Sequence, residues 1–168
     1  MPKGDLFGTT FQGGPDNAGT VFEIAKTGNG YAGTPTTLIT FNGSNGSNPA
    51  AGLIMDANGD LFGTTGAGTG GDGTVFEIAK TSNGYASTPT TLVTFDGSTG
   101  STPEAGLVID ANGDLFGTTT GGGTYGDGTV FEIANTGNGY ASTPTTLFSF
   151  NSTNGAEPFC RPDRRCEW

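Results

Sequence analysis

The chain has 168 residues, of which 32 are glycine, and its 16 acidic and six basic residues give a formal net charge of −10. It contains no histidine, which excludes Ser-His-Asp and Cys-His nucleophile relays and histidine-ligated metals. The negative charge would repel a phosphate backbone, so we expect no nucleic-acid partner. We also expect no membrane insertion, because no apolar run approaches the roughly 20 residues of a spanning helix.

Nearly the whole chain consists of three tandem copies of one unit of 54 or 55 residues. Three motifs recur in the same order in every copy. They are Gly-Asp-Leu-Phe-Gly-Thr-Thr at 4–10, 59–65 and 113–119, Gly-Thr-Val-Phe-Glu-Ile-Ala at 19–25, 73–79 and 128–134, and Thr-Pro-Thr-Thr-Leu at 34–38, 88–92 and 143–147. Such self-similarity is typical of repeat architectures.

Each unit contains short β-favouring runs that are separated by Gly, Asn, Asp and Pro. In the middle unit they predict strands at 52–56, 61–65, 74–79 and 91–95, with a tight turn at 56–60 between the first two. No segment has the 3.6-residue apolar period of a helix. The predicted fold is therefore all-β and β-propeller-like, built from three tandem four-stranded units, and a β-solenoid is the alternative.

We expect three propeller-type repeats within 1–159, at about 4–50, 51–104 and 105–159. The order of the motifs, from Pro-x-Ala-Gly-Leu through Asp-x-Asn-Gly-Asp-Leu-Phe-Gly-Thr-Thr and Gly-Thr-Val-Phe-Glu-Ile to Leu-x-x-Phe, resembles the bacterial choice-of-anchor GloVer tandem repeats over residues 4–159. The resemblance implies a secreted or surface-anchored, propeller-like protein.

The last nine residues, 160–168, differ from the repeats and contain both cysteines, all three arginines and the only tryptophan. A disulfide between Cys160 and Cys166 is one interpretation. The other is that the tail is the start of a fourth repeat translated in a shifted reading frame, because a permitted back-translation read one base later encodes Ala-Gly-Leu-Ile-Ala-Asp-Ala-Asn-Gly. On this interpretation the chain is a fragment of a longer array.

Two Asp-x-Asn-x-Asp triplets are the best candidates for metal ligands, because alternating oxygen side chains suit Ca²⁺. They comprise Asp56, Asn58, Asp60, Asp110, Asn112 and Asp114. The downstream bidentate acid of an EF-hand loop is absent, and Asp and Asn also form turns by bonding nearby backbone amides. We therefore prefer the turn interpretation over calcium and expect no cofactor.

Two further sets of residues recur once in each repeat and are candidate ligand-binding positions. Carboxylates in the middle of strands could bind sugar hydroxyls, or could be satisfied by threonine hydroxyls and backbone groups between repeats. Tyrosines that follow Asn-Gly could stack on sugar rings, or could anchor their own loops. The positions are Glu23, Glu77, Glu132, Tyr31, Tyr85 and Tyr140.

These features favour a non-enzymatic, extracellular or cell-surface repeat scaffold that binds partners such as cell-surface glycans. The first residues contain no apolar segment of a secretion signal, so any export signal or anchor is expected outside this chain. A polysaccharide-active enzyme using acidic residues and a self-assembling structural module are the alternatives. Because propellers close with about four to eight blades, we expect a homodimer that completes a six-bladed ring, with a higher oligomer or filament as the alternative.

Overall fold

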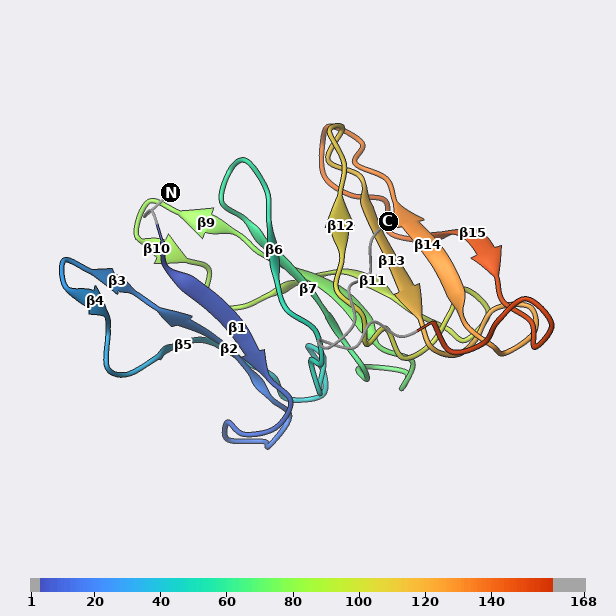
Figure 1. The fold of residues 1–168 in the computed structure, drawn as a ribbon, viewed down its shortest axis with the longest axis horizontal. Helices are drawn as coiled ribbons and strands as arrows, with labels where there is room; N and C mark the ends of the chain where they lie inside the picture. Colours follow the sequence, from blue (N-terminus) through green and yellow to red (C-terminus); the bar gives the residue numbers. More distant parts are fainter. Residues whose placement is uncertain (1–3, 159–168) are drawn as a thin grey trace.

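The computed structural model describes residues 4–158, and these form β-strands and connecting turns without a helix. Each sequence repeat contributes one main antiparallel sheet, and the three sheets follow one another along the long axis of the molecule (Figure 1). None of them closes on itself. The all-β prediction is confirmed, and the arrangement is consistent with both a propeller-like and a solenoid repeat fold.

The middle repeat has the complete set of strands. Its main sheet has the order β11-β8-β7-β6, and a two-stranded hairpin of β9 and β10 lies between β8 and β11 in the chain. The bounds are β6 (Ile54–Met55), β7 (Leu61–Thr65), β8 (Thr74–Ile78), β9 (Lys80–Thr81), β10 (Gly84–Tyr85) and β11 (Thr90–Thr94). Apart from the hairpin, consecutive strands pair with each other, as in a propeller blade.

The outer repeats follow the same plan. The first has a three-stranded main sheet of β1 (Leu6–Thr10), β2 (Thr20–Ile24) and β5 (Thr36–Thr40), with a hairpin of β3 (Lys26–Thr27) and β4 (Gly30–Tyr31). The third has a four-stranded sheet of β12 (Val108–Ile109), β13 (Leu115–Thr119), β14 (Thr129–Ile133) and β15 (Thr145–Ser149). All three sheets have a register shift where the last strand pairs with its neighbour.

The strands agree closely with the sequence prediction, but two differences are informative. The run at 52–56 pairs only over β6, because the residues on either side of this short strand belong to turns and to the connection from the preceding repeat. The segment around Asn83 closes the short β9–β10 hairpin, which is not among the four strands predicted for this unit. The tail at 160–168, with Cys160 and Cys166, lies outside the described residues.

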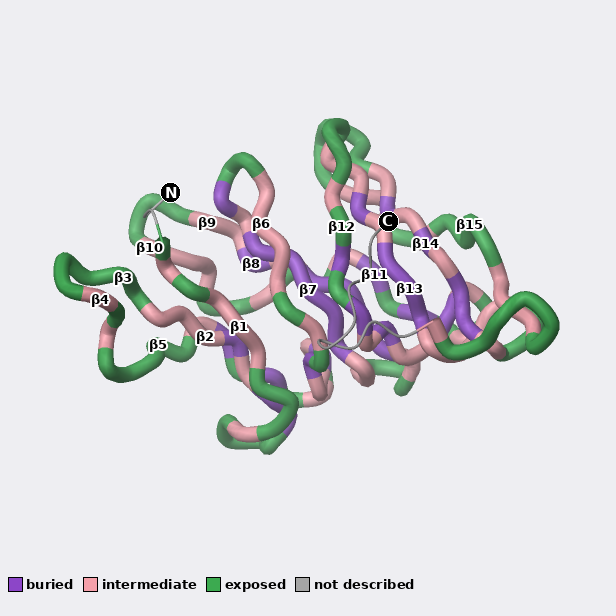
Figure 2. The backbone as a smooth tube through the Cα atoms, in the orientation of Figure 1, coloured by how far each residue is buried: buried purple, intermediate pink, exposed green. Residues whose placement is uncertain are grey.

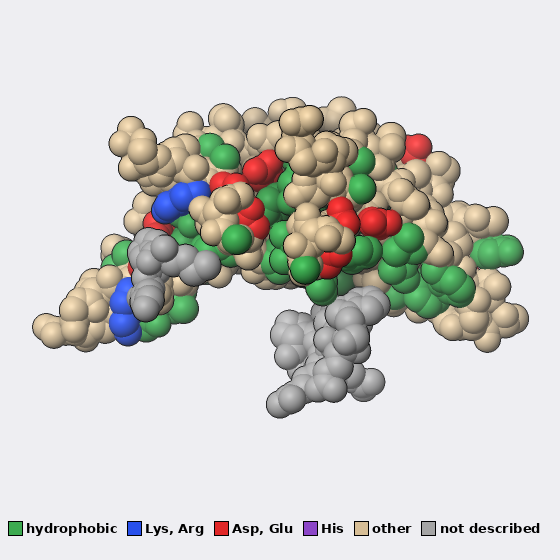
Figure 3. Space-filling view, turned by 90° about the horizontal axis from the view of Figure 1, so that it is seen from above, with side chains coloured by type: hydrophobic (Ala, Val, Ile, Leu, Met, Phe, Trp, Pro, Cys, Tyr) green, Lys and Arg blue, Asp and Glu red, His purple; other side chains and the backbone are tan. Residues whose placement is uncertain are grey.

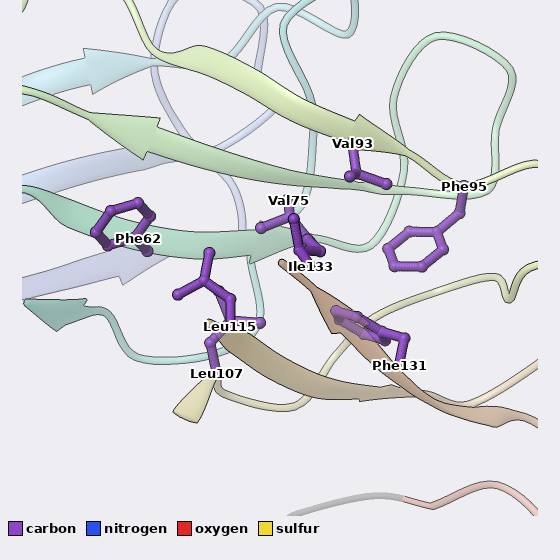
Figure 4. Close-up of a cluster of buried hydrophobic side chains, with 8 residues drawn as sticks. All are labelled: Phe62, Val75, Val93, Phe95, Leu107, Leu115, Phe131 and Ile133. Carbon is purple, nitrogen blue, oxygen red and sulfur yellow. The ribbon is translucent and has the colours of Figure 1, made fainter. Parts of the chain in front are cut away.

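The hydrophobic core lies between the sheets, in two separate clusters. One cluster lies between the first and middle sheets, and the other lies between the middle and third sheets. In the latter, side chains from the two sheets point toward one another (Figure 4). Its fully buried members include Phe62 and Val75 from the middle repeat and Leu115 and Phe131 from the third. Each sheet is therefore stabilised mainly by packing against the sheet of the next repeat, as apolar surface is removed from water there.

Burial along the chain follows from this stacking, with buried backbone concentrated in the middle of the molecule (Figure 2). All five residues of β7 are buried, because this strand has a neighbouring sheet on both faces. The equivalent strand β1 in the first repeat has no buried residue. Within residues 4–158 no helix is long and apolar enough to cross a membrane.

Candidate functional site

The Asp-x-Asn-x-Asp triplets form the turns that join β6 to β7 and β12 to β13. In the middle repeat, Oδ1 of Asp56 accepts hydrogen bonds from the backbone N–H groups of Asn58 and Asp60, both at 2.9 Å. The backbone N–H of Gly59, whose φ is +91°, donates to the carbonyl of Asp56. A carboxylate that bonds the following amides in this way is the usual Asx-type turn device.

The third repeat builds the same turn, and Oδ1 of Asp110 accepts from the backbone N–H groups of Asn112 and Asp114, both at 2.9 Å. The last acid of each turn joins it to the end of the next long strand. Oδ1 of Asp60 accepts the backbone N–H of Lys80 at 2.6 Å, and Asp114 accepts that of Asn135 at the same distance. These charge-assisted bonds hold the first turn against the end of β8 and the second turn against the end of β14.

All six residues proposed as metal ligands therefore lie in these two turns, where both pairs of aspartates act as hydrogen-bond acceptors. Among residues 4–158 no group of three or more His, Cys, Asp or Glu side chains is arranged to hold a metal ion. The preference for turns over calcium stays a prediction.

The repeated tyrosines lie at the junctions between repeats. Tyr85 of the middle repeat packs edge-to-face on Phe7 of the first, with ring centroids 5.4 Å apart. Tyr140 of the third repeat packs in the same way on Phe62 of the middle one, also at 5.4 Å. The equivalent Tyr31 of the first repeat is 46% exposed. Two of the three candidate tyrosines thus contact the preceding repeat.

The repeated glutamates lie in the second long strand of each sheet, where all three are partly buried. Glu77 is opposite Phe62 on one side and Thr90 on the other, and Glu23 and Glu132 have the equivalent phenylalanine and threonine neighbours. Burial raises the pKa of the Glu77 carboxyl, and the negative charges of Asp60 and Asp56 raise it further.

A groove of about 280 Å³ separates the turn of the middle repeat from the turn of the third. Both polar and apolar groups line it: Met55, Asp56, Ala57, Ile109, Asp110, Ala111, Asn112, Gly113, Asn135 and Tyr140. It opens on the face that carries the turns, where Asp and Glu side chains gather (Figure 3). Burial, with the charges of Asp56, Glu77, Asp60 and Asp114, raises the pKa of Tyr140 to about 12, so its hydroxyl remains a hydrogen-bond donor at neutral pH.

The two junctions differ at one basic residue. At the first, the Lys80 ammonium lies 3.9 Å from the centroid of the Tyr85 ring. The third repeat has Asn135 at this position, so the described residues that line the groove beside Tyr140 include no equivalent lysine. Asn135 and the apolar lining residues are not among the candidate positions predicted from the sequence. Alignment of the three copies does show the change from Lys26 and Lys80 to asparagine.

The raised pKa of Glu77 predicts a pH effect on stability. The folded state binds this proton more tightly than the unfolded chain does, so stability falls as the pH rises above the ordinary value of 4.5 toward the folded-state pKa. Glu77→Gln should remove this contribution, making the free energy of unfolding less dependent on pH in that interval. We expect an effect of no more than about 1 kcal/mol, because water screens a partly exposed group.

Urea unfolding at several pH values between about 4 and 7 measures the effect. This is roughly the interval in which a carboxyl group with a raised pKa titrates. Glu157→Gln is the matched control, since it removes the same charge from an exposed position. Parallel pH dependence in wild type and Glu77→Gln would contradict the assignment.

The comparison with known sequences gives one family. No curated protein matches the chain. The family model of the Gloeobacter/Verrucomicrobia repeat matches residues 1–162, almost the whole chain, which confirms the resemblance expected from the repeated motifs. The chain belongs to the Gloeobacter/Verrucomicrobia repeat family.

Proposed function

We propose that this chain is a non-enzymatic, extracellular repeat scaffold that binds polar ligands, such as cell-surface glycans, in the groove between the middle and third repeats. The observation that carries the proposal is the groove itself, in which two turns fixed by hydrogen bonds place polar groups around Tyr140. Rigid turns on a stacked framework favour binding, because little conformational entropy is lost when a ligand is bound.

The chemistry of the groove suits a carbohydrate. Carboxylate and amide oxygens of Asp110, Asn112 and Asn135 can accept hydrogen bonds from sugar hydroxyls, and the Tyr140 hydroxyl can donate one. Met55 and Ile109 supply apolar surface for the C–H faces of a sugar ring. The missing lysine favours a neutral or cationic ligand over an anionic one.

A polysaccharide-active enzyme is the second candidate, and the observation that favours it is the raised pKa of Glu77 near two other carboxylates. A carboxyl group with a raised pKa beside an ionised carboxylate is the usual acid–base pair of a glycosidase. One observation opposes it. Such catalysis needs two carboxylates in different environments, whereas the three repeats supply equivalent glutamates.

A glycan array probed with the full chain tests the proposal, with reducing-sugar release measured on every glycan that binds. Binding without product supports the scaffold, and sugar release would replace it with the enzyme. Tyr140→Phe should weaken binding about fivefold, the effect of losing one hydrogen bond of about 1 kcal/mol. Tyr125→Phe, on a side chain that is 62% exposed and outside the groove, is the matched control. Absence of binding to any glycan would contradict the proposal.

A further inference from the structure

The two internal interfaces have the same construction, in which each repeat uses one face toward the next repeat and another toward the previous one. We call these the forward face and the backward face. The forward faces are Phe7, Val21, Ile39 and Phe41 in the first repeat and Phe62, Val75, Val93 and Phe95 in the second. The backward faces are Leu53, Leu61, Phe76 and Ile78 in the second repeat and Leu107, Leu115, Phe131 and Ile133 in the third.

The backward face of the first repeat is not covered by any described residue that corresponds to a preceding repeat. Leu6 is 47% exposed there, whereas its equivalents Leu61 and Leu115 are 1% and 0% exposed. Phe22 and Ile24 are partly buried, although their equivalents in the other two repeats are 0% exposed. The first repeat therefore presents the same apolar residue types that elsewhere form an interface.

The forward face of the third repeat is likewise not covered by any described residue that corresponds to a following repeat. Phe148 is 45% exposed, whereas Ile39 and Val93 at the equivalent positions are each 1% exposed. Beside it lies an apolar pocket of about 260 Å³, lined by Val108, Phe116, Gly117 and Val130. The position of Phe116 is the one at which a tyrosine from the following repeat packs on Phe7 and on Phe62.

The two uncovered faces are of the two kinds that meet at each internal interface, one forward and one backward. Phe41 packs edge-to-face on Phe76 at 5.2 Å, and Phe95 packs on Phe131 at 5.0 Å. By the same equivalence, Phe150 of one chain would face Phe22 of another. Tyr31, which is exposed in the single chain, would reach Phe116 as the other tyrosines reach their phenylalanines.

The faces are also complementary in charge. Lys26 lies over the ring of Tyr31, with its ammonium 4.3 Å from the centroid, as Lys80 does over Tyr85. At the first internal junction the tyrosine is close enough to the carboxylates of Glu23 and Asp5 for them to raise its pKa. The third repeat has Glu132 and Asp114 at these positions. A second chain joined in this register would therefore bring Lys26 toward Glu132 and Asp114.

We propose that the forward face of the third repeat binds the backward face of the first repeat of a second copy of this chain, in the register of the internal interfaces. Two chains joined in this way form two identical contacts and a ring of six sheets, within the range of about four to eight blades in which propellers close. This surface is distinct from the groove beside Tyr140, so the proposal goes beyond the binding function and does not depend on it.

Sedimentation velocity of the full chain over a range of micromolar concentrations tests the proposal. We expect a species of twice 16.9 kDa. Leu6→Glu and Phe148→Asp each place a charge in one half of the contact, and each should weaken dimerisation at least tenfold. Both side chains are exposed in the single chain, so the fold should be preserved, which thermal unfolding of the monomeric variants checks.

Tyr125→Asp is the matched control, because it replaces an exposed aromatic side chain outside both faces and should leave the dimer intact. A monomer at all concentrations would overturn the proposal, as would a dimer that persists in both face variants. Larger assemblies that disappear in both variants would support the head-to-tail contact and overturn closure of the ring by two chains.

Discussion

Phe131→Ala is expected to lower the free energy of unfolding by about 3–5 kcal/mol, the usual cost of removing a buried aromatic ring from a core. Phe131 is 0% exposed and packs edge-to-face on Phe95 of the preceding sheet. Its ring also lies over the backbone of Gly117, where an added Cβ would be only 2.6 Å from Cζ of the ring. The substitution leaves a cavity in the buried cluster that joins the middle and third sheets.

Urea unfolding monitored by circular dichroism measures this loss, and the linear dependence on urea gives the free energy. Phe11→Ala is the control, because Phe11 is 51% exposed and its removal should cost less than about 1 kcal/mol. Equal losses in the two variants would show that the inter-sheet cluster does not provide the main stabilisation.

The strands could be predicted from the sequence because the three copies repeat the same β-favouring runs between glycines. The location of the core could not. In β7, Leu61 and Phe62 are neighbours in sequence and point to opposite faces of the sheet, yet each is 1% exposed. A strand that is buried on both faces lacks the alternation of apolar and polar residues, so the pattern cannot show which side chain meets which repeat.

The candidate site was predictable in its local parts and not in its assembly. The turn at 56–60 follows from short-range chemistry, since Asp and Asn bond amides only two to four residues away. The contact of Tyr140 with Phe62 joins residues of different repeats, and its geometry depends on how two sheets stack. The groove between the turns depends on the same stacking.

The second large effect is expected at Gly73, the first residue of the middle Gly-Thr-Val-Phe-Glu-Ile-Ala motif. Its φ of +91° disfavours any residue with a side chain. A Cβ added there would also lie 2.4 Å from Cδ of Pro103 and 2.5 Å from the backbone oxygen of Thr65. Gly19 and Gly128 also have a positive φ, +97° in each, and are also crowded by a proline and a threonine carbonyl, so the requirement belongs to the repeat itself.

We therefore expect Gly73→Ala to destabilise the protein by about 2–5 kcal/mol, the sum of a left-handed backbone strain of about 1–2 kcal/mol and overpacking of about 1–3 kcal/mol. Two controls separate these causes. Gly70 has φ +98° and nothing within 4 Å of an added Cβ, so Gly70→Ala should show the strain alone. Gly52 has open space and no positive φ, so Gly52→Ala should be neutral or slightly stabilising. Thermal unfolding ranks the variants, since each kcal/mol shifts the Tm of a domain of this size by roughly 2–4 °C. If Gly73→Ala and Gly70→Ala lost the same stability, the close approach of Pro103 to Gly73 would not constrain the junction between repeats.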